Sequence, residues 1–414
     1  MTLPEKWRLP VSMACASLSA ACLVGAYEFV RTPSTTIFMD SYGAAKLPYA
    51  LSAVPFMMAA LIYLYARLLS LAGPMRTILA SMLLTGLAFV WVYTALPATG
   101  HAHGMLPAFF YIFGQAYIVI FVEQYWAFIN STLNSITARV YNGPIAGGGA
   151  LGPVLADWMV HKYAVSGGTA HLILFAAAAM LPAALLIWIS YLVAGEPKPS
   201  ADEAGAKKGH LHLSLIKEQK ALLLLMCTIF LTQIIATVLD LKLSTVVESA
   251  IPGTDARSQW FGGFWMSINS ASAILQFIVA PLLLRLLPIA AVMVAIPSLH
   301  LVAAVCLIAH PTLLTAALAL GMFKAIDYSI FRAGKELVYI PLSFDARYRA
   351  KQLVDAFTYR FSKGVTALSL SAWESVMPLL GAAPLPPYSA IAACAAALWV
   401  GISVPLGNAI EKSR

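Results

Sequence analysis

The sequence predicts an all-α polytopic membrane protein of about twelve spans, built as two related halves. Three observations predict this fold class: the composition, the length of the apolar stretches, and a polar segment near the middle of the chain. Of the 414 residues, 60% are hydrophobic and 11% are charged, whereas soluble domains carry about 25% charged residues. Because apolar burial saturates as domains grow, a soluble fold could not cover this much apolar surface. The composition therefore indicates a chain that lies in lipid.

Apolar stretches of about 20 residues are long enough to cross the core of a bilayer. The first stretch follows a basic N-terminus but continues past Ala26 into Glu28 and Arg31 without a cleavage site, so it is interpreted as a span and not as a signal peptide. Glycines or charges interrupt the stretches at 139–160 and 349–378. The expected spans lie at about 10–31, 47–69, 74–96, 105–129, 141–160, 170–193, 220–246, 260–284, 288–309, 312–331, 351–378 and 386–409.

A polar segment from Glu196 to Lys220 separates the sixth span from the seventh. Its prolines, acidic residues, lysines and histidines are typical of a solvated linker. We therefore expect an N-terminal six-helix bundle over 1–195, a cytoplasmic linker over 196–219 and a C-terminal six-helix bundle over 220–414.

Basic residues predict the orientation of the chain. From Lys6 and Arg8 at one end to Lys412 and Arg414 at the other, they flank the spans mainly on one side. The positive-inside rule then puts both termini and the linker in the cytoplasm. We expect the spans to lie in a bacterial inner membrane. This asymmetry explains the net charge of +8 without binding to nucleic acid.

Carboxylates at matched positions indicate an internal repeat. Glu28, late in the first span, corresponds to Asp240 in the seventh, and Glu123 in the fourth span corresponds to Asp327 in the tenth. Six spans, a cytoplasmic linker and six more spans are the layout of the major facilitator superfamily, whose members are secondary transporters.

Ionisable side chains within spans are costly and usually face the bundle interior or water. Glu28 and Arg31 are three residues apart, so they share a helix face and can form a structural ion pair near the outer surface, or serve a substrate. Glu123 is a lone carboxylate that is either protonated or paired with a cation from another helix. It is accompanied by polar and aromatic side chains: Gln124, Tyr125, Trp126 and Asn130.

The second half carries more cations in its spans. Asp240 and Lys242 lie in the seventh span, and Lys324, Asp327, Arg332, Lys335 and Glu336 in and after the tenth, with Arg360 and Lys363 in the eleventh. Cations carried inward indicate either an anionic substrate or internal carboxylate partners. In the first half, the glycine-lined stretch 145–155 lacks a phosphate-loop pattern and is expected to allow close helix packing.

Several stretches resemble the nucleotide transport protein family, the ATP–ADP translocases of plastids and intracellular bacteria. They are AYEFVR, LPYALSAVPF and EQYWAFINSTLNSITARVY in the first half, and TVLDLKLS, WFGGFW and the segment 335–364 in the second. The resemblance implies a major facilitator fold, exchange of nucleotides and a transport role for Asp240. The family's first-span lysine is absent, because Arg31 is followed by Thr32 and Pro33.

We expect a secondary active transporter that works by alternating access and moves an anionic small solute, such as a nucleotide or related phosphorylated metabolite. The alternative is proton-coupled import or export of an amphipathic solute, such as a siderophore, peptide or drug, which the absent lysine and the Tyr125/Trp126 pair favour. No enzyme motif, cofactor or metal site is expected, and the chain is expected to act as a monomer. The candidate binding or coupling residues are Glu28, Arg31, Glu123, Tyr125, Trp126, Asn130, Asp240, Lys242, Asp327, Arg332, Lys335 and Arg360.

Overall fold

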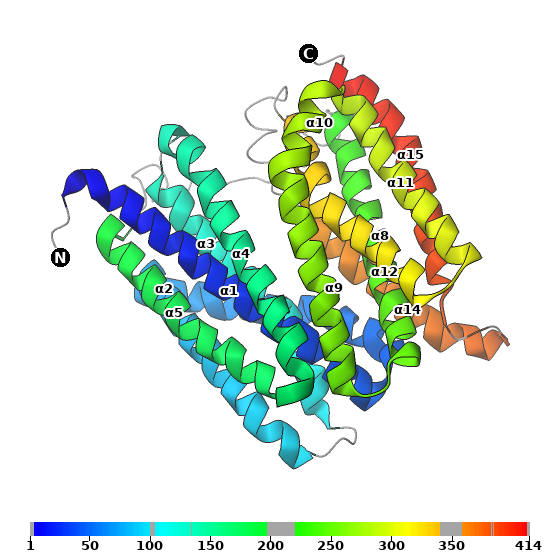
Figure 1. Ribbon diagram of the computed structural model, residues 1–414, viewed down its shortest axis with the longest axis horizontal. Helices are drawn as coiled ribbons and strands as arrows, with labels where there is room; N and C mark the ends of the chain where they lie inside the picture. Colours follow the sequence, from blue (N-terminus) through cyan, green and yellow to red (C-terminus); the bar gives the residue numbers. More distant parts are fainter. Residues whose placement is uncertain are drawn as a thin grey trace. The chain divides into compact units, whose positions relative to one another are not determined.

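The computed structural model describes residues 4–99, 104–133, 135–196, 220–339, 358–381, 383 and 385–411. Its regular elements are all helical, as predicted, within these ranges (Figure 1). Most of the expected linker, and residues 340–357 of the family-like segment, lie outside the described residues. In the first half, the elements are α1 (Glu5–Tyr42), η1 (Ala44–Lys46), α2 (Leu47–Thr99), α3 (Met105–Thr132), α4 (Ser135–Gly167) and α5 (His171–Ala194).

The second half contains short π-helical and 3-10 turns between its α-helices. They are α8 (Lys220–Ala250), α9 (Thr254–Ile274), η2 (Leu275–Val279), α10 (Ala280–Leu286), α11 (Ile289–Ala309), α12 (Leu313–Ile326), η3 (Asp327–Phe331), α13 (Arg332–Tyr339), α14 (Thr358–Val376), η6 (Met377–Leu380) and α15 (Tyr388–Glu411).

Nine helical stretches in the described part of the chain are long and apolar enough to cross a membrane. One of them contains α2, which bends at Gly73 (φ 78°, ψ 170°) and covers both the second and the third expected span. α4 and α14 cover the two stretches interrupted by glycines or charges, and neither is among the nine.

The expected boundaries of the first span were too short. α1 runs from Glu5 to Tyr42, although Thr32, Ser34, Thr35 and Thr36 make its second half polar. The structure shows why the helix continues. The hydroxyls of Thr35 and Thr36 donate to backbone carbonyls one turn earlier, so these polar side chains are satisfied inside the helix.

The chain divides into two compact units. Unit 1 comprises residues 1–43, 53–207 and 251–269, and unit 2 comprises residues 44–52, 208–250 and 270–414. The first part of α9 therefore belongs to unit 1 and its last turn to unit 2. The domain boundaries expected at the linker stay a prediction.

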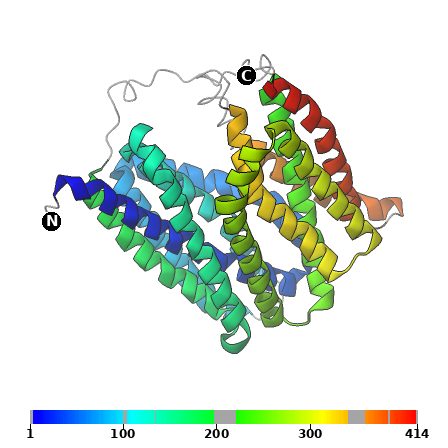
Figure 2. The same cartoon turned by 45° about the horizontal axis from the view of Figure 1, so that its top comes forward.

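In unit 1, α1 packs lengthwise against α5 and α4 (Figures 1 and 2). Glycines permit the approach to α4: a Cβ atom on Gly152 would overlap the backbone of Ala21, and one on Gly25 would lie 3.2 Å from the carbonyl oxygen of Gly152. The expected packing role of the stretch 145–155 is confirmed. On the other side, the hydroxyls of Ser12 and Ser190 join α1 to α5 at 2.8 Å.

In unit 2, α8 and α11 both pack against α15, and α12 lies against α8 and α11 (Figure 1). Trp399 of α15 and Phe323 of α12 are completely or almost completely buried, and the ring of His300 on α11 lies between them. Aromatic and aliphatic side chains thus form the core of unit 2.

Candidate functional site

The predicted interaction between Glu28 and Arg31 is confirmed: the two side chains form an ion pair on α1. Glu28 is only 3% exposed, so the pair lies inside unit 1. The guanidinium of Arg31 also stacks on the ring of Trp265 from α9, 3.7 Å from its centroid. The charge of Arg31 is therefore engaged by two neighbours within the unit.

A second buried carboxylate, Asp157 of α4, joins this ion pair. Asp157 is fully buried, and its Oδ2 accepts a 2.7 Å hydrogen bond from the side-chain amide of Asn269 on α9. The carboxyl groups of Asp157 and Glu28 lie within hydrogen-bonding reach of each other. Carboxyl groups this close, away from water, hold a shared proton more readily than two negative charges. We call Glu28, Arg31, Asp157 and Asn269 the carboxyl cluster.

Aromatic side chains close one side of the carboxyl cluster. Tyr117 of α3 is 1% exposed, and the charge of Glu28 acts on it. Its ring lies near that of Tyr27 from α1, with the ring centroids 6.4 Å apart. The hydroxyl of Tyr117 has no hydrogen-bond partner among the residues that the structure describes. Charged and polar groups from α1, α3, α4 and α9 thus meet in one buried place.

Glycine contacts explain why these side chains meet. Gly25 and Gly152 bring the backbones of α1 and α4 together; Glu28 lies about one turn after the first, and Asp157 just over one turn after the second. On α9, a Cβ atom at Gly262 would lie 2.5 Å from the backbone nitrogen of His161. Close backbones let a short side chain such as Asp157 reach the neighbouring helix.

The sequence analysis missed Asp157, Trp265 and Asn269. Asp157 carried a usable signal, because it lies within the expected span 141–160 and is a carboxylate in an apolar stretch. Asn269 and Trp265 carried none, because neutral amides and aromatic side chains are common in spans. Only the approach of α9 to α1 and α4 gives them a part in the cluster.

The structure places the predicted group around Glu123 differently. Glu123 is exposed on α3 and acts electrostatically on Tyr65 of α2. Tyr125 is 5% exposed, and its ring meets that of Trp126 edge to face, with the centroids 6.2 Å apart. The side chain of Asn130 lies outside the described residues. A coupling role for Glu123 stays a prediction.

Unit 2 holds a second group of charges, which we call the lysine cluster: Asp240 of α8, Lys324 of α12, Asp327 of η3 and Lys363 of α14. Asp240 and Lys324 are the charged neighbours that act on Lys363. Asp327 is surrounded by the charges of Lys324, Lys335 and Arg332, and it opens a π-helical turn, a feature that is frequent at functional sites.

The other predicted residues of unit 2 differ in exposure. Lys242 and Lys335 are half-buried, and Arg332 is exposed. The side chain of Arg360 is outside the part of the structure that is described. Within the lysine cluster two lysines accompany two carboxylates, and Arg332 and Lys335, which also act on Asp327, add two positive charges beside it.

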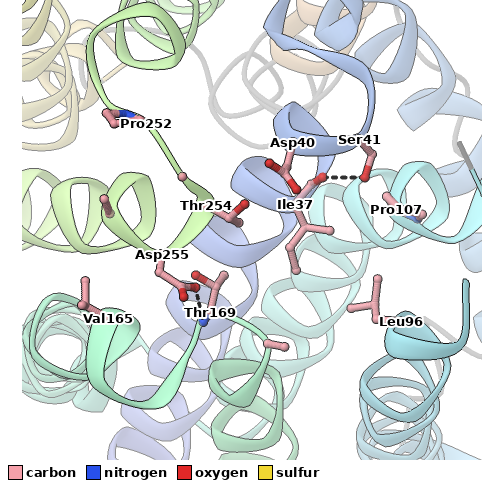
Figure 3. A pocket seen from close by; sticks show the side chains of 13 residues that line it. Ile37, Asp40, Ser41, Leu96, Pro107, Val165, Thr169, Pro252, Thr254 and Asp255 are labelled. Carbon is pink, nitrogen blue, oxygen red and sulfur yellow. Dashed lines mark hydrogen bonds between the residues drawn. The ribbon is translucent and has the colours of Figure 1, made fainter. Parts of the chain in front are cut away.

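A cavity of about 760 Å³ lies at one end of unit 1 (Figure 3). Two carboxylates from different helices line it, Asp40 of α1 and Asp255 of α9, and the Asp255 carboxylate accepts a 2.7 Å hydrogen bond from the backbone N–H of Thr169. Cavities of this size that are mainly apolar with a few polar groups are typical of binding sites. The apolar part of the wall is formed by side chains such as Ile37, Leu96, Val165 and Pro252.

Comparisons with known proteins support the fold. No family model matches the chain, and no curated protein matches its sequence; the resemblance to nucleotide transport proteins is therefore not confirmed. A crystallised D-xylose–proton symporter superposes with a TM-score of 0.68 at 11% identity, over 95% of this chain and 97% of its own. An auto-inhibited peptide transporter of the POT family reaches 0.68 at 13% identity, with 97% of each chain covered.

A nucleoside transporter is also similar, with a TM-score of 0.60 at 13% identity over 98% of this chain and 99% of its own. At such identities a structural likeness establishes the fold and leaves the activity open. The protein has the major facilitator fold, as the arrangement of spans predicted.

Proposed function

We propose that this protein is a secondary transporter that moves a small anionic solute together with protons by alternating access. The observation that carries the proposal is the contact between Glu28 and Asp157, two buried carboxyl groups served by the single guanidinium of Arg31. Buried ionisable groups inside a helical membrane bundle are a recurrent feature of proton relays. The major facilitator fold supports the general class.

Protonation would change the charge of the carboxyl cluster by one unit. With one proton on the carboxyl pair, the two acidic groups and Arg31 are neutral together; without it they carry one negative charge. A neutral cluster is less costly to keep away from water than a charged one. Proton binding therefore shifts the balance between conformations that bury the cluster and conformations that expose it.

The lysine cluster supports an anionic solute. Lys363 interacts with Asp240 and Lys324, and Asp327 interacts with Lys324, Lys335 and Arg332. Four cations beside two carboxylates favour an additional negative charge. An ammonium group is a point charge that suits carboxylate or phosphate oxygens. We therefore assign the solute to small carboxylates or phosphorylated metabolites.

A two-stage experiment tests this function. Thermal unfolding of the purified protein with inorganic phosphate, dicarboxylates, sugar phosphates and nucleotides identifies the ligand, because a bound solute stabilises the folded state. Uptake of that ligand into proteoliposomes is then measured with and without an inward proton gradient. Accumulation that follows the gradient is expected, and its abolition in Glu28→Gln and Asp157→Asn supports the coupling role. Equal accumulation with and without the gradient rejects proton coupling.

Nucleotide exchange is the second candidate. The excess of cations around Asp240 and Asp327 and the resemblance of segment 335–364 favour it. Exchange requires nucleotide on the inner side and is independent of an imposed pH gradient, whereas cotransport with protons shows the opposite dependence. Stabilisation by ATP or ADP that is lost in Lys363→Ala would favour exchange.

We also propose that both termini lie in the cytoplasm, on the basis of the charge asymmetry of the loops, and that the spans lie in a bacterial inner membrane, as the family resemblance implies. The cavity of unit 1 then opens on the outer side, because it lies at the C-terminal end of α1. A reporter active only in the cytoplasm, fused after Arg414, is expected to be active. A reporter that is inactive there would reverse the orientation.

A further inference from the structure

We propose that protons reach the carboxyl cluster from the cavity of unit 1 along a chain of buried hydroxyl groups, those of Thr169, Ser258, Thr36 and Thr32. This inference rests on the proposed proton coupling and gives it an outer opening and a route. We call these four hydroxyl groups the hydroxyl chain.

The outer half of the hydroxyl chain is continuous. Thr169 lines the cavity, and its hydroxyl donates to Ser258 of α9 at 2.9 Å. The hydroxyls of Ser258 and Thr36 are 2.7 Å apart. Thr169 is 3% exposed, and Ser258 and Thr36 are fully buried. Three elements thus supply a hydrogen-bonded row of oxygens that begins at the cavity wall and ends on α1.

The inner half of the hydroxyl chain follows α1. Thr36, Thr32 and Glu28 recur every four residues, so they share one helix face. The Thr36 hydroxyl donates to the backbone carbonyl of Thr32 at 3.0 Å, which points its hydrogen toward the carboxyl cluster. Successive side chains on this face are separated by about 6 Å of helix rise.

Thr32 is the decisive residue of the inner half. Its side chain is 2% exposed, and its hydroxyl has no hydrogen-bond partner among the described residues. Buried hydroxyls nearly always have a partner, and a spacing of one helical turn suits one bridging water molecule on either side. A water between Thr36 and Thr32, and another between Thr32 and Glu28, completes the route.

The cavity is suited to collect protons. Asp40 and Asp255 place negative charge on its wall (Figure 3), and such charge raises the local concentration of cations. Thr169 connects the cavity wall to the hydroxyl chain, because its N–H donates to Asp255 and its hydroxyl donates to Ser258. A proton held at the cavity wall is therefore next to the first hydroxyl of the chain.

Proton transfer along this route is balanced at each oxygen. A hydronium ion in the cavity gives a proton to the Thr169 oxygen while Thr169 passes its own proton to Ser258, and the same exchange continues through Thr36, the bridging waters and Thr32. For this exchange the Thr36 hydrogen turns from the Thr32 carbonyl to the bridging water. The Glu28–Asp157 pair gains one proton, and one water molecule remains in the cavity. Each hydroxyl both donates and accepts, so rotation of the O–H groups resets the chain.

The test uses the full chain in proteoliposomes and needs no transported solute. A proton released by light outside the vesicles protonates the carboxyl cluster, and time-resolved infrared spectroscopy follows the C=O stretch of the new carboxylic acid. The band is assigned by its loss in Glu28→Gln and Asp157→Asn. We expect the band to form ~10-fold or more slowly in Thr32→Val and Ser258→Ala, and at the normal rate in Thr32→Ser, which restores the hydroxyl.

Ser34→Ala is the matched control. Ser34 is fully buried on α1, and its hydroxyl donates to the Arg31 carbonyl of the same helix. Its variant is expected to form the band at the normal rate. Equal slowing in Ser34→Ala, or normal rates in Thr32→Val and Ser258→Ala, overturns the hydroxyl chain and leaves proton coupling intact. A carboxylic acid band that persists in both carboxyl variants overturns the proposed coupling itself.

Discussion

The amide of Asn269 donates a 2.7 Å hydrogen bond to Asp157 and so ties α9 to α4 beside the Glu28–Arg31 ion pair. Asn269 is one of four α9 residues on a single helix face, with Ser258, Gly262 and Trp265. Each of them contacts α1, α4 or the turn after α4. A change in the protonation of Asp157 therefore acts directly on α9.

Removal of the Asp157 carboxylate is expected to separate solute movement from proton movement. Asp157→Asn keeps the size of the side chain and loses the group that binds the proton, so gradient-driven uptake should fall by ~100-fold while solute counterflow continues. Uptake and counterflow are measured in the same proteoliposomes. Glu123→Gln is the comparison, because Glu123 is exposed on α3. An equal loss of gradient-driven uptake in this variant would show that proton coupling is not specific to the carboxyl cluster.

Arg31 is expected to be essential for stability. Arg31→Ala leaves Glu28 and Asp157 buried without their cation, which typically costs about 3–5 kcal/mol. Arg31→Lys keeps the charge and loses the stacking on Trp265, worth about 0.5–2 kcal/mol. Thermal unfolding in detergent measures both. If Arg31→Ala unfolds at the same temperature as the parent protein, Arg31 is not the main partner of the two carboxyl groups.

The contact between α1 and α4 gives a paired prediction with an internal control. A Cβ atom on Gly152 would overlap Ala21, whereas one on Gly149 would lie 3.7 Å from the Ala20 Cβ, an ordinary contact. Gly152→Ala should therefore destabilise the protein by about 1–3 kcal/mol through overpacking, and Gly149→Ala should not destabilise it. Thermal unfolding measures both variants, and Gly152→Ala should unfold at the lower temperature. A reversed order would contradict the observed helix contact.

Lys363 is expected to determine the affinity for the anionic solute. Lys363→Ala removes a positive charge next to Asp240 and Lys324, so the dissociation constant should rise by ~10-fold or more, since a hydrogen bond to a charged group is worth about 1.5–3 kcal/mol. Lys363→Arg should retain part of the affinity. Ligand titrations at two salt concentrations measure the effect. Unchanged binding in Lys363→Ala would place the anion elsewhere.

Some of the carboxyl cluster could be predicted from the sequence. The Glu28–Arg31 ion pair depends on a spacing of three residues in one helix, and such local geometry is independent of the rest of the fold. The packing role of the glycines at 145–155 was predictable for a similar reason, because small residues in an apolar stretch have few other uses. The exposure of Glu123 was not predictable, since the apolar pattern of its span does not show which face of the helix other helices cover.

The sequence by itself determined the membrane class, the helical spans and the pairs that share one helix. The tertiary structure alone decided that Asp157 meets Asn269, 112 residues further along the chain, and that Lys363 lies near Asp240 and Lys324. The physical reason is that helix periodicity fixes which side chains share a face. Close backbone contacts, such as those at Gly25, Gly152 and Gly262, fix which faces meet.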